Sequence, residues 1–382
     1  MSGFLSRWNV LALVLSGALF AAAGAVIGLG SFDGAADADT AAERLNPPAP
    51  RATFSFTGDT LTLRRVNYSA RKPDGTFDYH HMFRGIEPYI SWADVAICHV
   101  ENPVAPPGEP VIIEPPEMSS AASLASALAS GGFDRCSTAS NHSLDRGAAG
   151  IDATLGALDA AGIAHHGTAR TADERRAQPF VVNDIGVAHL SYSYGFDGKP
   201  FPAGEPWRAN PIDAAVIVAD AARARADGAE AVIVSLHWGA TAAAQPTSYQ
   251  RTVAEAITAS GMIDLIVGHH AHVLQPITQV NGVWVVWGLG NLLSDHPTGP
   301  LLPPASQDGA IVSVTLAKGP TGEIRVSTPT AIPTWVDKQQ GHVIRTTLEM
   351  HDPALPISTR AELARSHART SALLAGFVIV TP

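Results

Sequence analysis

The sequence predicts an α/β fold in which two mixed β-sheets pack face to face as a layered sandwich flanked by helices. From residue 53 to about residue 275, short apolar runs alternate with segments whose apolar residues recur at helical spacing. After Gln275 strand-like segments predominate. Such alternation, followed by antiparallel strands, is typical of sheets with helices on their outer faces. Polar residues recur directly after the apolar runs, where sites form in sheets of this kind.

The individual elements follow from local patterns. Thr53-Phe54-Ser55-Phe56 alternates as a half-buried strand does, and Leu124 and Leu128 lie four apart, as on one helix face. Asn281-Gly282 is typical of a tight hairpin turn. Strands are expected at residues 53–56, 94–100, 133–138, 231–236, 263–267, 284–287, 310–316 and 377–380, with a hairpin over 180–194. Helices are expected at residues 120–130, 151–158, 211–226, 249–260 and 359–374.

The amino-terminal residues have the pattern of a targeting segment. Arg7 and the amino terminus precede Val10 to Leu29, an uncharged run long enough to cross a bilayer as a helix. Its alanines also offer a small-residue cleavage site, so residues 1–30 are either a signal peptide or a membrane anchor. Residues 31–51, rich in Ala, Asp and Pro, are expected to be a linker. With either reading, the domain that follows is expected outside the cytoplasm.

Composition narrows the classes of function. The net charge of −10 argues against a nucleic-acid partner, which would require a basic face. Two cysteines are too few for a zinc ribbon or a disulfide scaffold, whereas fifteen histidines allow a histidine and carboxylate metal site. Cys98 and Cys136 each lie in an apolar run. They are either buried free cysteines or, if their strands are neighbours in an oxidising compartment, a disulfide.

Five strand ends carry candidate metal ligands. Each residue alone has an ordinary explanation, such as a turn aspartate or a hydrogen-bonded histidine. An H-x-H pair on an extended segment would direct both imidazoles to one side. Together, carboxylate, amide and imidazole groups suit one or two divalent ions of Mn, Fe or Zn, with a bridging carboxylate in the two-ion case. The candidates are Asp59, Glu101, Asn141, His237, His270 and His272.

Six segments in order resemble one known family. They are Gly58-Asp59, Ala93-Asp94 through His99-Val100-Glu101, Ala139 through Gly147, Ser235 through Gly239, Gly268 through Pro276, and Gly288 through Leu292. Their pattern resembles the CapA/PgsA family of bacterial capsule (poly-γ-glutamate) synthesis proteins, within the metallophosphatase, or calcineurin-like phosphoesterase, superfamily. The resemblance covers residues 53 to 296. It implies a metallophosphatase-like domain over residues 52–300, and we expect residues 301–382 to complete the same domain.

The resemblance also implies roles for single residues. Asp59 and His272 resemble ligands of a first metal, and Glu101 stands at the bridging position. Asn141, His237 and His270 resemble ligands of a second metal. His142 is placed like the general acid that protonates a leaving oxygen. Asp145, three residues later, would orient and charge that imidazole. The alternative for Asp145 is a helix N-cap for the run from Ala148 onward.

This chain departs from the superfamily pattern at three positions. Leu61 stands where the wider pattern D-x-H has its histidine, and Val100-Glu101 stands where the wider pattern has Gly-Asp. His99 replaces the usual asparagine, so it is either the missing imidazole ligand or a hydrogen-bond donor behind the ligands. His269 competes with His270 for the ligand role. Whether the site holds one metal ion or two therefore stays open.

These features together predict a metal-dependent hydrolase that cleaves a phosphoester. The resemblance implies that it acts in the synthesis, export or trimming of a cell-surface polymer such as capsule or poly-γ-glutamate. Arg64 and Arg65 are candidate clamps for a substrate phosphate or carboxylate, or else solvated surface arginines. The alternatives are an amide hydrolase of polyglutamate and a non-catalytic, membrane-anchored subunit that binds the polymer. Expected partners are the anionic polymer or phosphoester substrate, the membrane and other capsule-synthesis membrane subunits.

Overall fold

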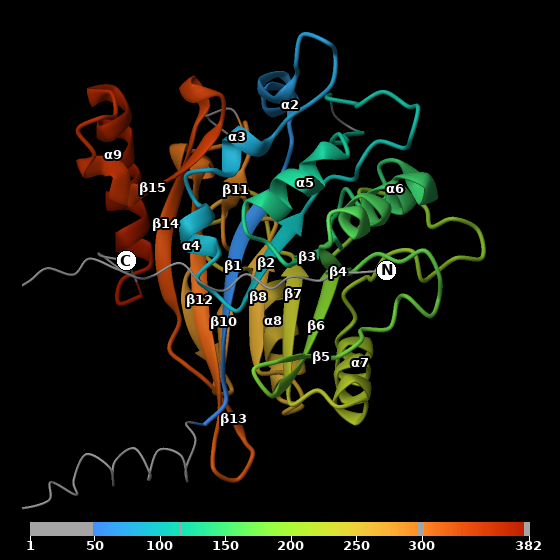
Figure 1. Ribbon diagram of the computed structural model, residues 1–382. Coiled ribbons are helices and arrows are strands. Elements are labelled where there is room, and N and C mark those ends of the chain that lie inside the picture. Colours follow the sequence, from blue (N-terminus) through green and yellow to red (C-terminus); the bar gives the residue numbers. More distant parts are fainter. Residues whose placement is uncertain (1–48, 115–116, 297–298, 300–301, 378–382) are drawn as a thin grey trace, which may run out of the picture. The chain divides into compact units, whose positions relative to one another are not determined.

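A computed structural model describes residues 49–114, 117–296, 299 and 302–377 (Figure 1). The expected signal peptide or anchor at 1–30 lies outside these residues, as do most of the linker and residues 378–380 of the expected last strand. Within the described part of the chain, no helix has the length and apolar character needed to cross a membrane.

The first sheet is mixed and contains the two strands that begin the family-like motifs. Its order is β15-β14-β12-β1-β2-β3-β4, with β11 also paired to β1 and β13 to β12. Strands β1 to β4 run parallel, whereas β12, β14 and β15 are antiparallel to their neighbours. The strands are β1 (Arg51–Thr60), β2 (Val95–Val100), β3 (Arg135–Ser137), β4 (Ala164–His166), β11 (Asn291–Leu293), β12 (Asp308–Lys318), β13 (Ile324–Val326), β14 (Thr330–Asp337) and β15 (Val343–Thr346).

The second sheet has the order β5-β6-β7-β8-β10-β9. Strands β6, β7, β8 and β10 are parallel, and the edge strands β5 and β9 are antiparallel. The strands are β5 (Phe180–Val182), β6 (Ile185–Ser193), β7 (Ala231–His237), β8 (Leu265–His269), β9 (Ile277–Val280) and β10 (Val283–Val286).

Helices cover the outer faces of the sheets. They are α2 (Arg64–Ala70), α3 (His80–Phe83), α4 (Glu87–Ile90), α5 (Ser123–Ser130), α6 (Gly147–Ala160), α7 (Ala214–Ala226), α8 (Ser248–Thr258) and α9 (Ile357–Leu373), with 3-10 turns η1 (Pro304–Gln307), η2 (Lys338–Gln340) and η3 (Thr347–His351). Helices α3, α5 and α6 lie on the first sheet, and α7 and α8 on the second (Figure 1).

Three apolar cores hold these layers together, because each sheet must bury both of its faces. Between the sheets, Phe54 and Phe56 of β1 meet Ile233 of β7 and Leu265 of β8. A second core lies under α3, α5 and α6, and a third under α7 and α8. The predicted α/β sandwich of two mixed sheets flanked by helices is therefore confirmed.

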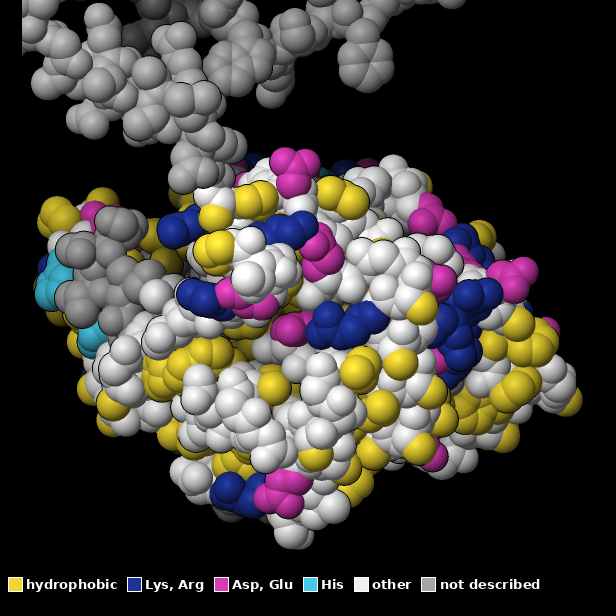
Figure 2. All heavy atoms as spheres, turned by 90° about the horizontal axis from the view of Figure 1, so that it is seen from below, with side chains coloured by type: hydrophobic (Ala, Val, Ile, Leu, Met, Phe, Trp, Pro, Cys, Tyr) yellow, Lys and Arg dark blue, Asp and Glu magenta, His cyan; other side chains and the backbone are white. Residues whose placement is uncertain are grey.

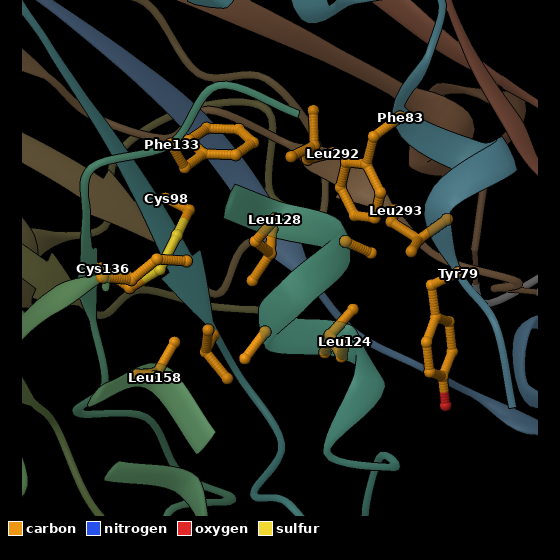
Figure 3. Close-up of a cluster of buried hydrophobic side chains, with 14 of the residues drawn as sticks. Tyr79, Phe83, Cys98, Leu124, Leu128, Phe133, Cys136, Leu158, Leu292 and Leu293 are labelled. Atoms are coloured by element: carbon orange, nitrogen blue, oxygen red, sulfur yellow. A yellow bond between two sulfur atoms is a disulfide. The ribbon is translucent and has the colours of Figure 1, made fainter. Parts of the chain in front are cut away.

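The two cysteines occupy paired positions on neighbouring strands. Cys98 of β2 and Cys136 of β3 are opposite one another in the parallel register and are joined as a disulfide. The bond lies beside Leu128 and Phe133 in the core under α5 (Figure 3). The sequence allowed a disulfide only if the strands of the two cysteines are neighbours, and β2 and β3 are neighbours.

One predicted turn is confirmed, whereas several elements differ from expectation. The Asn281-Gly282 turn joins β9 to β10, and both of its residues have positive φ. Helices α2 to α4 and strands β4, β11, β13, β14 and β15 had not been expected. Most of these are seven residues or fewer, too short for periodicity to be detected. Residues after 300 add β12 to β15 to the sheet of β1.

The carboxyl end of β1 points toward α2, away from the face shown in Figure 2. That opposite face carries acidic and basic side chains interspersed among apolar ones (Figure 2). Lys318, whose backbone N–H bonds to Pro50 just before β1, pairs there with Glu230. Charges of both signs thus alternate at this end of the molecule.

Candidate metal centre

Asp59 lies at the carboxyl end of β1 and is buried. Its backbone N–H donates to the carbonyl of Gly290 at 2.9 Å, and a Cβ on Gly58 would lie 2.2 Å from that oxygen. Only glycine therefore fits at position 58, which explains the Gly-Asp pair. The Asp59 carboxylate accepts the backbone N–H of His270 at 3.1 Å and lies 3.2 Å from Nδ1 of His272.

Strand β2 supplies two more buried groups beside Asp59. His99 is the direct neighbour of Asp59 in the parallel register, and Glu101 follows the strand by one residue. His99 Nε2 lies 3.0 Å from Nδ1 of His237, and its ring stacks on that of His269 with 4.1 Å between centroids. As predicted for an extended segment, His99 and Glu101 lie on the same side and both face the cluster of candidate ligands around Asp59.

His237, the last residue of β7, brings the second sheet to the same point. Its Nε2 lies 2.7 Å from Oδ1 of Asn141. The amide of Asn141 in turn donates to Asp197 at 2.9 Å, which directs the Asn141 oxygen toward His237. The two ends of β2 and β7 thus meet although their strands belong to different sheets.

The prediction of an extended H-x-H segment was wrong. Strand β8 ends at His269, and His270 and His272 have φ values of 83° and 56°, in the left-handed region. These conformations turn the chain so that both imidazoles still face the cluster. Asn291 accepts from Nδ1 of His272 at 3.0 Å, which leaves Nε2 of His272 free, 3.5 Å from Glu101. Backbone strain of this kind is common where side chains must converge on a ligand.

The donor atoms fall into three groups whose members lie within 4.8 Å of one another. They are Asp59, His99 and His237; Glu101, His237 and His270; and Asp59, Glu101 and His272. Asp59, Glu101 and His237 each belong to two groups, an arrangement suited to bridging or adjacent ions. His269 lies 3.3 Å from Asp59, so it remains close to the ligand set.

The cluster contains buried polar atoms without hydrogen-bond partners. They include Oδ1 of Asp59, both carboxylate oxygens of Glu101, and Nδ1 of His269 and of His270. Leaving such atoms unsatisfied is costly, and carboxylate and imidazole atoms are ligands for divalent ions. The residues present therefore fit a divalent metal ion.

The electrostatics reflect carboxylates and imidazoles held together away from water. Burial raises the pKa of Asp59, but His269 and His272 outweigh it and hold that pKa well below its ordinary value. Burial raises the pKa of Glu101 to about 7, although His272 opposes it. Burial lowers the pKa of His272, but the charge of Glu101 and the contact with Asp59 raise it to about 9.

His142 lies at the edge of this cluster, partly accessible. Its Nδ1 is 2.9 Å from Oδ2 of Asp145, and that oxygen also accepts the backbone N–H of Met118. Helix α6 begins at Gly147 with Arg146 as its N-cap, so the alternative role of Asp145 as a cap is wrong. Burial lowers the pKa of His142, but its hydrogen bond to Asp145 and the charge of Glu101 raise it above the ordinary value.

Comparison with known proteins identifies the family to which the chain belongs. A family profile described as "Bacterial capsule synthesis protein PGA_cap" matches residues 53–296. The chain belongs to this capsule synthesis family. The matched region contains every residue of the cluster and ends at His296.

Two relatives extend this finding. The "PGA biosynthesis protein CapA" of Bacillus subtilis (strain 168) is 28% identical over 284 residues, which cover 72% of this chain and 70% of that protein. The "Capsule biosynthesis protein CapA" of Bacillus anthracis is 25% identical over 64% of this chain and 60% of that protein. The chain thus matches less than two thirds of the length of the second relative.

Solved structures resemble the chain only at low sequence identity. The NAD nucleotidase of Haemophilus influenzae gives a TM-score of 0.48 at 10% identity, covering 87% of this chain and 64% of that one. The calcineurin-like phosphoesterase YfkN from Bacillus subtilis gives 0.46 at 14% identity, covering 85% and 98%. Both scores lie below 0.5, so the likeness adds nothing to what the side chains themselves indicate.

In this member of the family, the two candidate clamp arginines lie outside the three groups of candidate ligands. Arg64 pairs with Glu114 at 2.9 Å and is 59% exposed. Arg65 is 75% exposed and lies 3.9 Å from Asp295. Because Asp295 precedes His296, whose ring packs against His272 at 4.3 Å, Arg65 is the arginine that borders the site.

Four residues of the site were not predicted. Asn291 orients His272, Asp197 orients Asn141, the ring of Tyr194 lies 4.6 Å from that of His270, and His296 packs on His272. Asn291 follows Gly290 in the family-like segment Gly288 through Leu292, and that position could have suggested it. The others lie in irregular segments, where no periodic pattern marks a residue that folds back on the site.

Proposed function

We propose that this capsule synthesis protein is a metal-dependent hydrolase that cleaves a phosphoester in a cell-surface polymer or its precursor. The observation that carries the proposal is the convergence of Asp59, Glu101 and His272 around unpartnered buried atoms, with His142 at the accessible edge. A buried cluster of this kind needs a cation to be stable, and a partly accessible imidazole beside it suits acid catalysis.

The proposed ligands are Asp59, Glu101, Asn141, His237, His270 and His272, with His99 in the position of the missing D-x-H imidazole. When bound, a divalent ion would supply Lewis-acid chemistry, polarising a phosphoryl oxygen and acidifying a water molecule. Asn291 and Asp197 act on the ligands, because each fixes the orientation of a group that faces the ion. His99 Nδ1 is likewise oriented by Ser137 at 2.8 Å.

His142 is the proposed general acid. Because Nδ1 bonds to the Asp145 carboxylate, Nδ1 carries a hydrogen, and Nε2 is the atom that can transfer a proton to a leaving oxygen. Nε2 has no hydrogen-bond partner among the described residues. Asp145 both orients the ring and stabilises its charged form.

We also propose an extracytoplasmic location, with residues 1–30 as signal peptide or anchor. The disulfide between Cys98 and Cys136 supports this, because such bonds persist mainly in oxidising compartments. The expected partners are the anionic polymer, the membrane through the amino-terminal segment, and other membrane subunits of capsule synthesis.

The test begins with elemental analysis of the purified protein, followed by turnover of phosphodiester and phosphomonoester substrates with added Mn²⁺. Wild type and His142→Ala are compared. Bound metal with turnover that collapses in the variant supports the proposal. Metal without phosphoester turnover but with cleavage of a γ-glutamyl amide favours the amide hydrolase, and metal with neither activity favours the polymer-binding subunit. No metal after a Mn²⁺ soak refutes the ligand assignment.

A further inference from the structure

The chain beyond the family-matched region reaches the metal-ligand cluster. Strand β14 leads into η2, and the first residue of η2 is Lys338. Its ammonium donates to the backbone carbonyl of His296, whose ring packs edge-to-face on His272 with 4.3 Å between centroids. Lys338 is thus one residue removed from a proposed metal ligand, although residue 338 lies outside the matched range.

Three side chains surround one carboxylate at this point, and two of them, Lys338 and Arg65, carry a positive charge. Asp295 lies 3.8 Å from the ammonium of Lys338, 3.9 Å from Nε of Arg65 and 3.5 Å from Nε2 of His342. These distances exceed those of a hydrogen bond, so Asp295 does not use the donors of Lys338. An ammonium has three donors, and the bond to His296 uses one. Around Asp295, Lys338 and Arg65 therefore bring two positive charges to one carboxylate.

Lys338 also lines a cavity of about 410 Å³ between η1, η2 and α9. This volume is within the range of ligand pockets. The other charged groups there are paired: Arg365 with Glu362 at 2.5 Å, and Asp337 with Arg345 at 3.0 Å. The remaining walls carry amides, hydroxyls and an indole, supplied by Gln307, Gln339, Ser358, Thr359 and Trp335.

We propose that Lys338 and this cavity form a binding subsite for an anionic chain that extends from the metal centre. One charged group of the chain contacts Lys338 and Arg65, and the next unit enters the cavity between η2 and α9. The proposal rests on the proposed function, since it places the scissile bond at the cluster. It assigns to residues 301–382 a role in holding substrate. Carboxylate and phosphate chains share the required charge.

The test is calorimetric binding to the full chain as purified, with each probe checked for cleavage after the titration so that binding is separated from turnover. The probes are a pentaglutamate peptide and a linear pentaphosphate. We expect Lys338→Met to weaken binding of at least one probe about tenfold, the effect of losing one hydrogen bond to a charged group. Lys318→Met, on the opposite face and paired with Glu230, is the matched control and should bind as wild type does.

Two further variants guard against misfolding as the cause. Arg65→Gln changes an exposed side chain and should weaken binding about threefold, as expected for a partly screened charge. Ser358→Trp fills the cavity from an exposed position and should weaken the long probe but not free glutamate or phosphate. A pentaglutamate response identifies a carboxylate chain, and a pentaphosphate response identifies a phosphate chain.

The inference is overturned if neither probe binds wild type, or if Lys338→Met binds both probes as wild type does. If Ser358→Trp binds pentaglutamate or pentaphosphate as wild type does, the cavity is not part of the subsite. Hydrolysis by the metal-loaded protein together with Lys338-independent binding would refute this inference alone. Lys338-dependent binding without any hydrolysis would refute the proposed function alone.

Discussion

Nδ1 of His142 and Oδ2 of Asp145 lie 2.9 Å apart, and the same carboxylate oxygen accepts the backbone N–H of Met118 at 2.9 Å. Two donors therefore fix the carboxylate, and the carboxylate fixes the imidazole at the edge of the metal-ligand cluster. The relationship predicts that His142 depends on Asp145 for both its orientation and its charge.

Asp145→Asn keeps the shape of the side chain but removes its charge. We expect the turnover number to fall about 10²-fold, since positioned acid catalysis contributes on this scale. Metal content should be unchanged, because Asp145 is not in the ligand groups. Steady-state kinetics with elemental analysis checks this, and Asp173→Asn, at an exposed position, is the control. Unchanged turnover would mean that Asp145 is structural only.

His99→Asn introduces the asparagine that the family resemblance implies at this position. His99 lies within 4.8 Å of the donor atoms of Asp59 and His237, so we expect the variant to bind metal at least about tenfold more weakly. Binding stabilises the folded state by about 2.7 kcal/mol when free metal is 100 times the Kd. Thermal unfolding with Mn²⁺ and with a chelator measures this, and we expect a smaller metal-dependent rise of Tm in the variant. An equal rise would show that His99 is not a ligand.

The disulfide between Cys98 and Cys136 closes a loop of 38 residues. Removing it in a Cys98→Ala, Cys136→Ala variant should lower the free energy of unfolding by about 3–4 kcal/mol, because the unfolded chain regains the entropy of that loop. Urea unfolding of the two proteins provides the measurement, and a thiol titration of unfolded wild type provides the control. Two free thiols in protein recovered from outside the cytoplasm would contradict the assignment.

Buried His166 predicts a loss of stability in acid. Its Nδ1 accepts from Ser191, its Nε2 donates to the carbonyl of Arg175, and burial lowers its pKa to about 3. An unfolded histidine has a pKa of about 6.5, so between these values the unfolded chain binds more protons. The contribution of His166 to the free energy of unfolding is therefore complete above that window. It decreases as the pH is lowered, by up to about 1.4 kcal/mol per pH unit.

His166→Gln removes this titration and should flatten the dependence of unfolding free energy on pH between about 6 and 4. Burial lowers the pKa of other histidines too, such as His189, so the relevant quantity is the difference between variant and wild type. Urea unfolding at a series of pH values measures it. Parallel profiles for the two proteins would show that His166 is not linked to acid unfolding.

Much of the fold was predictable because its signals are local. Phe54 and Phe56 alternate with polar residues, Leu124 and Leu128 share a helix face, and Asn281-Gly282 forms the predicted turn. Short strands such as β4 and β11 were missed because their pairing partners, not their own residues, make them strands. Their three residues contain too little pattern to distinguish them from loops.

The sequence by itself determined the types of the candidate ligands, their order along the chain and their positions at strand ends, because the residue after a buried strand emerges at the edge of a sheet. Only the tertiary structure decided how they meet. His270 and His272 reach the cluster through left-handed backbone, His99 contacts His237 across two sheets, and Lys338 arrives from a strand beyond the motifs. Such contacts join residues as far apart in the chain as Asp59 and His272. They depend on the packing of whole sheets, which no local pattern encodes.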